Sequence, residues 1–103
     1  MNIKITSRKF RAKDSLKEYI KEEIKSLEKF NDQIMDASVI LSYTHPKDSI
    51  KSVEIVLQIP GKVITVTDST EEFEKSISGA LAKLIRQLQK IKTKRITRKK
   101  HED

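Results

Sequence analysis

The sequence predicts an α+β domain of order β-α-β-β-β-α, in which two helices pack on one face of a four-stranded sheet. Four short segments alternate apolar and polar residues, which is typical of strands with one buried face. Two longer segments instead repeat apolar residues at three- and four-residue steps, the spacing of one helix face. With 103 residues, the chain suits a single domain built around one core.

The first strand is predicted at residues 2–7 and the first helix at about 14–30. Two isoleucines share one side of the strand, and polar residues occupy the other side. We expect Asp14 or Ser15 to cap the helix, because Ser15 and Glu18 have the spacing of a capping box. The apolar face of this helix consists of Leu16, Tyr19, Ile20, Ile24, Leu27 and Phe30.

Three more strands are predicted at about 36–44, 52–59 and 63–68. A polar loop at 45–49 joins the first two of them. A Pro-Gly pair then forms a hairpin corner, because proline presets the first turn torsion and glycine accepts a positive φ at the second. The face of the sheet opposite the helices is expected to be solvated by Asn2, Lys4, Ser52, Glu54 and Gln58.

A long second helix is expected to start at Ser69–Glu72, which has another capping-box spacing. Gly79 inside this helix costs roughly 1 kcal/mol relative to alanine, so we expect it to mark close packing. We predict a domain of residues 1–94 and a basic tail of residues 95–103 that can be disordered. The apolar face of the second helix consists of Phe73, Ile77, Ala80, Leu81, Leu84, Leu88 and Ile91.

The distribution of charge is the most informative functional feature. The chain has 22 Lys and Arg against 15 Asp and Glu, a net charge of +7, which favours nucleic acid or an acidic surface as the partner. Ten of these cations and no acidic residue lie between residues 75 and 100. An ordinary solvated helix interleaves both signs of charge, so the second helix is interpreted as an RNA-binding element.

Four cations of this helix form a narrow ridge, which we call the basic stripe: Lys83, Arg86, Lys90 and Lys94. At about 100° per residue, the stripe is offset by roughly a quarter to a third of a turn from the apolar face. Such a ridge can follow a phosphate backbone. Gln87 on the same ridge can form hydrogen bonds to a sugar or a base.

Two other pairs of cations are candidate RNA contacts. Lys25 and Lys29 belong to the first helix, where interleaved glutamates bring the charge close to neutral, as on a solvated surface. Arg8 and Lys9 belong to an acid-free cluster before that helix. This cluster either forms a continuous groove with the helix cations or is a solvated loop.

The sequence contains no catalytic or metal-binding constellation, so we predict no enzyme activity, metal, cofactor or small-molecule substrate. It has no cysteine and no glycine-rich phosphate loop, and His45 and His101 are isolated. Capping explains the acidic residues near the start of the second helix: Asp68, Glu71, Glu72 and Glu74.

A membrane partner is not expected, and we predict a cytoplasmic protein. The N-terminus lacks the long apolar run of a signal peptide or a membrane span. A basic amphipathic helix can also lie on a membrane or in a calmodulin-like groove. However, the sheet needs these apolar residues for its core.

Three passages resemble the ribosome hibernation-promoting factors, also called protein Y or ribosome-associated inhibitor A. Asn2–Ser7 is similar to the first strand of that family, and Leu16–Phe30 is similar to its first helix. The most specific passage is Lys83–Lys90, which resembles the family segment Lys-Leu-x-Arg-Gln-Leu-x-Lys. The resemblance extends to about Lys94. We expect a short form, because the sequence ends at Asp103 without a linker and second domain.

The resemblance implies binding in the channel of the small ribosomal subunit where messenger RNA and tRNA lie. This binding would block translation and preserve idle ribosomes under stress or in stationary phase. The implied partners are the small subunit, its rRNA and whole ribosomes, and the free protein is expected to be a monomer. The implied RNA contacts are Lys83, Arg86 and Lys90, with weaker support for Lys25 and Lys29.

The segment Glu72–Ser78 departs from the family. At the start of the second helix, family members often have an Asp-Met-Tyr-Ala-Ala-Ile-Asp-like sequence, and this chain keeps only its apolar positions. Two other classes of function also remain open. A general double-stranded-RNA-binding module usually begins with a helix, and the first strand argues against it. An adaptor that docks its basic tail on an acidic protein would associate with its partner independently of ribosomes.

Overall fold

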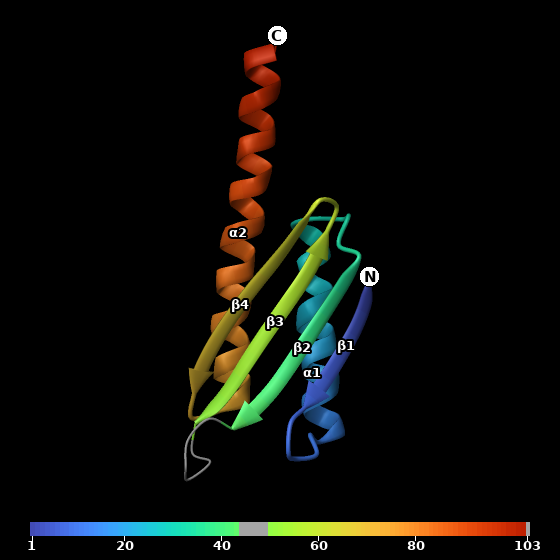
Figure 1. The fold of residues 1–103 in the computed structure, drawn as a ribbon, viewed down its shortest axis with the longest axis vertical. Coiled ribbons are helices and arrows are strands. Elements are labelled where there is room, and N and C mark those ends of the chain that lie inside the picture. The colour runs from blue at the N-terminus through green and yellow to red at the C-terminus, as the bar shows by residue number, and fades with distance from the viewer. Residues whose placement is uncertain (44–49, 103) are drawn as a thin grey trace.

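A computed structural model describes the backbone of residues 1–43 and 50–102, and the side chains of residues 1–43 and 50–91. Its element order confirms the predicted β-α-β-β-β-α arrangement. The strands form one sheet, and both helices cover the same face of it (Figure 1). The elements are β1 (Asn2–Ser7), α1 (Asp14–Lys25), a 3-10 turn η1 (Ser26–Lys29), β2 (Asp36–Tyr43), β3 (Lys51–Ile59), β4 (Lys62–Thr70) and α2 (Phe73–Glu102).

The strands lie in the order β1-β2-β3-β4. Strand β1 runs parallel to β2, because α1 carries the chain back between them, and the other pairs are antiparallel. The predicted Pro-Gly corner is confirmed: Ile59 pairs with Lys62, and Gly61 has a φ of 76°. Strands β1 and β4 are therefore the two edges of the sheet.

The core lies between the sheet and the two helices. Strands β2 and β3 bury alternate residues, as their period of two predicted. The predicted apolar face of α2 is also confirmed, since Phe73, Ile77, Ala80, Leu81, Leu84 and Leu88 are buried and Ile91 is half-buried. The opposite face of the sheet is open, with Asn2 and Lys4 exposed and Ser52, Glu54 and Gln58 half-buried.

The capping box predicted for α1 is wrong. The N-cap residue is Lys13, and no side chain forms a capping hydrogen bond there. The chain becomes helical at Asp14, so Ser15 already lies inside the first turn, beyond the position from which a hydroxyl caps. The far end of the predicted helix also tightens, since residues 26–29 form a 3-10 turn.

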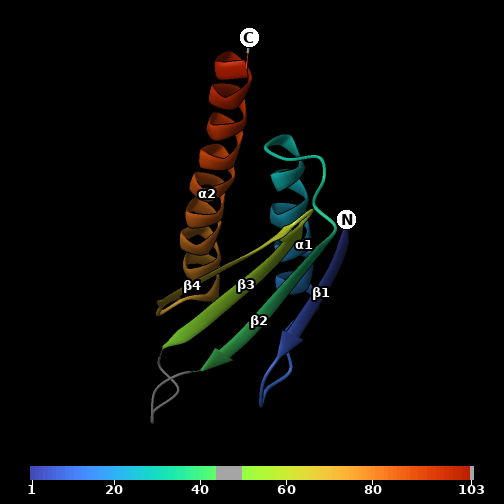
Figure 2. The same ribbon diagram turned by 45° about the horizontal axis from the view of Figure 1, so that its top comes forward.

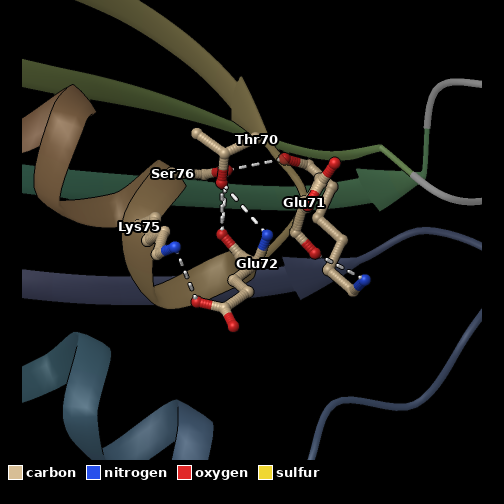
Figure 3. Close-up of polar contacts among 6 residues, drawn as sticks. Thr70, Glu71, Glu72, Lys75 and Ser76 are labelled. Carbon is tan, nitrogen blue, oxygen red and sulfur yellow. Dashed lines mark hydrogen bonds and ion pairs between the residues drawn. The ribbon is translucent and has the colours of Figure 1, made fainter.

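The capping box predicted for α2 is also wrong, and Thr70 takes the place of Ser69. Strand β4 extends to Thr70, so the Ser69 hydroxyl lies on the open face, 2.7 Å from the Ser52 hydroxyl. Thr70 Oγ1 instead accepts a hydrogen bond from the Glu72 backbone N–H at 3.1 Å (Figure 3). The start of α2 is thus stabilised by the last residue of the strand before it.

A buried hydroxyl attaches the first turn of α2 to the sheet. Ser76 is fully buried, and its Oγ donates to the Lys51 carbonyl at 2.7 Å and lies 2.9 Å from Thr70 Oγ1 (Figure 3). Lys51 Nζ in turn donates to the Glu71 carbonyl at 2.9 Å. These bonds join β3, β4 and α2, and they orient the helix that carries the basic stripe.

Several predictions concern residues outside the described part of the chain. They are the end of the second strand at residue 44, the loop 45–49, and the side chains of Lys94 and of the tail 95–103. The backbone of α2 continues to Glu102. The division into a domain of residues 1–94 and a tail stays a prediction.

Candidate nucleic-acid interface

The basic stripe lies on the surface of α2. Lys83, Arg86, Gln87 and Lys90 are all exposed, whereas the alternating Leu84 and Leu88 are buried in the core. The helix is held by its apolar face, so its cations project beside that face, as the periodicity predicted. Lys94, the fourth predicted member, has a side chain outside the described residues.

The stripe occupies the flank of α2 that faces edge strand β4. Lys83 Nζ donates to the Thr67 carbonyl of β4 at 2.5 Å. The other flank faces α1, where the Tyr19 hydroxyl lies 3.5 Å from the Ser78 hydroxyl. Figure 2 shows the same arrangement, with α2 behind β3 and β4 and α1 behind β1 and β2. The stripe therefore points away from α1.

The cations of the stripe differ in whether other groups of the protein already bind them. Lys83 forms an ion pair with Asp68 at 3.6 Å in addition to its bond to Thr67. Arg86 and Lys90 have no ion pair or side-chain hydrogen bond among the residues whose side chains the structure describes. Arg86 and Lys90 are thus the stripe cations most open to a phosphate group.

Lys25 and Lys29 are exposed, and they belong to α1 and η1 rather than to α2. Lys29 lines a hollow of about 320 Å³ where η1 and the loop after it meet Leu88 and Ile91 of α2. The acidic residues Glu28 and Asp32 line the same hollow. Its mixed charge is a weaker attraction for phosphate than Arg86 and Lys90, which have no acidic partner among the described side chains.

Arg8 and Lys9 are also exposed. The Arg8 backbone N–H donates to the Leu41 carbonyl at 2.9 Å. Arg8 also lines a hollow of about 240 Å³ on the open face of the sheet with Ser42 and Glu54. Arg8 therefore lies on the face of the sheet opposite the helices, and a continuous groove of loop and helix cations stays a prediction.

Asp68 is the residue whose position the sequence interpretation missed. It was assigned to the capping acids of the second helix, but it belongs to β4 and lies against the first third of α2, beside Gly79 and Lys83. The signal was the period of two in β4, which places Asp68 on the same side as the buried Ile64 and Val66.

The described part of the chain contains no group of three or more His, Cys, Asp or Glu side chains that could hold a metal ion. Among its helices, none has the length and apolar character needed to cross a membrane.

Comparison with known sequences identifies relatives across nearly the whole chain. The family model described as Sigma 54 modulation protein / S30EA ribosomal protein matches residues 3–96. A ribosome hibernation promoting factor from Azotobacter vinelandii is 31% identical over 98 residues, which cover 95% of this chain and 89% of that protein. A ribosome hibernation promotion factor from Deinococcus radiodurans is 29% identical over 92 residues. That match covers 87% of this chain and 48% of the relative, so the chain spans about half of its length.

Solved structures show the same fold. A ribosomal subunit interface protein from Coxiella burnetii superimposes with a TM-score of 0.81 at 22% identity, covering 90% of this chain and 99% of the other. The N-terminal domain of Thermus thermophilus Protein Y gives a TM-score of 0.77 at 25% identity, covering 88% and 99%. The chain therefore belongs to the Sigma 54 modulation protein / S30EA ribosomal protein family, which confirms the resemblance to the ribosome hibernation factors.

Proposed function

We propose that this protein is a ribosome hibernation factor that binds small-subunit rRNA in the channel for messenger RNA and tRNA. Bound there, it blocks translation and preserves idle ribosomes under stress or in stationary phase. The observation that carries this proposal is the pair of exposed cations Arg86 and Lys90 in a helical segment, residues 75–100, that contains no acidic residue. Both curated relatives are named for ribosome hibernation, which supports the same function.

The geometry of the stripe suits a structured RNA. Arg86 and Lys90 are one turn apart on a helix that is packed against the sheet, so their spacing is fixed before binding. The helix thus fixes where the two side chains begin, although each long side chain still loses rotamer freedom when it contacts a phosphate. The rest of the domain then has to match the shape of the RNA, and this match provides specificity that charge alone does not.

The remaining parts of the proposal concern the free protein. We place it in the cytoplasm, where ribosomes are, as a monomer that binds small subunits or whole ribosomes without a cofactor or small-molecule substrate. It acts by occupying a site, so one molecule should silence one ribosome. This stoichiometry distinguishes it from an enzyme, which would turn over.

Translation in a purified system should fall in proportion to added protein and reach its minimum near about one molecule per ribosome. A double variant, Arg86→Glu with Lys90→Glu, should inhibit poorly because it repels phosphate. Lys4→Glu with Lys62→Glu is the matched control, since it makes the same charge change at exposed positions of the sheet. Three results would contradict the proposal: full inhibition at far less than one molecule per ribosome, no inhibition at all, or equal inhibition by the two double variants.

A further inference from the structure

We infer that Asp68 is a specificity-determining residue that occupies Lys83 in the free protein and withholds this cation from arbitrary RNA. The inference rests on the proposed function of the basic stripe and deepens it. The observation behind it is a juxtaposition: the Asp68 carboxylate of β4, the Lys83 ammonium of α2 and the backbone of Gly79 meet at one place.

The position of Asp68 favours a nearby cation. Its side chain is only 26% exposed and points to the helix side of β4, where its partner across the strands is the buried Val53. A carboxylate that leaves water is costly unless a counter-charge or a hydrogen bond compensates it. Lys83 Nζ at 3.6 Å supplies this charge.

Gly79 provides the space for the carboxylate. A Cβ atom at this position would lie 2.8 Å from Asp68 Cγ and closer still to Oδ2, so a side chain there would displace the carboxylate. Glycine inside a helix costs roughly 1 kcal/mol relative to alanine. The close packing expected at Gly79 is therefore confirmed, and the group packed against it is a charged one.

A second bond fixes Lys83 in place. Its Nζ donates to the Thr67 carbonyl, which belongs to the edge strand β4. The ammonium thus lies between an edge carbonyl and the Asp68 carboxylate, whereas Arg86 and Lys90 have no such partner among the described side chains. Among the stripe cations whose side chains the structure describes, Lys83 alone is bonded to the sheet.

This arrangement lowers affinity for the wrong RNA more than for the right one. The Lys83 side chain is 52% exposed, so its ion pair contributes little to stability, and a well-placed phosphate can replace the carboxylate. Asp68 also repels a phosphate that approaches Lys83, so an RNA reaches Lys83 only where its other contacts with the domain outweigh this repulsion. Specificity often arises from such a repulsive element. Arbitrary RNA then contacts Arg86 and Lys90 but not Lys83.

The test counts phosphate contacts from the salt dependence of binding. Asp68→Asn keeps the size of the side chain and removes its charge. For duplex RNA of arbitrary sequence, the variant should steepen the log–log slope of affinity against salt by about 0.7 to 0.9, the value of one extra contact. Its affinity should rise about fivefold near 0.15 M salt. For isolated small subunits the slope should stay unchanged, because Lys83 already contacts phosphate there.

Two controls separate the release of Lys83 from a general gain of positive charge. Asp36→Asn removes an exposed carboxylate on the open face of the sheet, and it should leave both slopes unchanged. Asp68→Asn in a Lys83→Gln background should no longer steepen the slope for duplex RNA. An unchanged slope for Asp68→Asn, or an equal change in the Lys83→Gln background or with Asp36→Asn, would overturn the inference.

A further pair of variants decides the matter if Asp68→Asn does not fold. For small subunits, Lys83→Gln should flatten the log–log slope of affinity against salt by about 0.7 to 0.9, the value of one phosphate contact. For duplex RNA, it should flatten the same slope by less than half as much. Arg86→Gln should flatten both slopes equally. Equal flattening by Lys83→Gln with both RNAs would overturn the inference. A failure to bind small subunits would contradict the proposed function. The measurements with duplex RNA need no ribosome, so their slopes would still decide the role of Asp68.

Discussion

Leu84→Asp is expected to unfold the domain. Leu84 is fully buried between α2 and the sheet, and the surrounding core is apolar. An unpaired carboxylate at this position costs at least several kcal/mol, whereas a domain of this size is stable by only about 5 to 15 kcal/mol. Thermal melting followed by far-UV circular dichroism should show a cooperative transition for the wild type and none for the variant.

The matched control is Ala82→Asp, which places the same side chain at an exposed position two residues earlier in α2. This change alters helix propensity by less than about 1 kcal/mol, so the variant should melt cooperatively close to the wild type. A cooperative, wild-type melting curve for Leu84→Asp would show that the buried face of α2 is assigned wrongly.

Arg86→Glu combined with Lys90→Glu is expected to reduce affinity for small subunits at least about 20-fold near 0.15 M salt. Two lost phosphate contacts account for this factor, and the new negative charges should weaken binding further. Both side chains are exposed, so the melting temperature should stay near the wild-type value. Equilibrium binding of fluorescently labelled protein to isolated subunits measures the effect.

The Lys4→Glu, Lys62→Glu variant has the same net charge and should bind much more tightly than the stripe variant. Equal losses for the two double variants would mean that net charge, rather than the position of the stripe, determines binding. Lys83 is left out of this test for a structural reason: a glutamate there would face Asp68 and perturb the sheet edge as well as RNA binding.

The strands and helices could be predicted because periodicity records which side of each element meets the core. The alternation in β2 and β3 and the three- and four-residue steps in α2 each correspond to a buried face. The caps were harder to predict. A Ser-x-x-Glu spacing occurs at Ser15 and at Ser69, but whether a hydroxyl caps a helix depends on the residue at which the chain becomes helical.

The stripe itself was predicted from charge spacing, but the partner of Lys83 was not. Asp68 and Lys83 are on different elements, and only the packing of α2 against β4 brings them together. Gly79 was the available hint, because a glycine in a helix often marks a close approach. The position of Arg8 on the open face of the sheet was likewise not indicated by the sequence, because it depends on how the residues after β1 pack.

Competition on isolated small subunits tests the central claim most directly. Labelled protein is bound at physiological salt and challenged with messenger RNA plus initiator tRNA, or with an equal mass of arbitrary duplex RNA. We expect messenger RNA and tRNA to displace the protein from the channel, and duplex RNA to compete poorly because it does not reproduce the shape of the site. Undiminished binding with messenger RNA and tRNA in place, or equal competition by duplex RNA, would contradict the account.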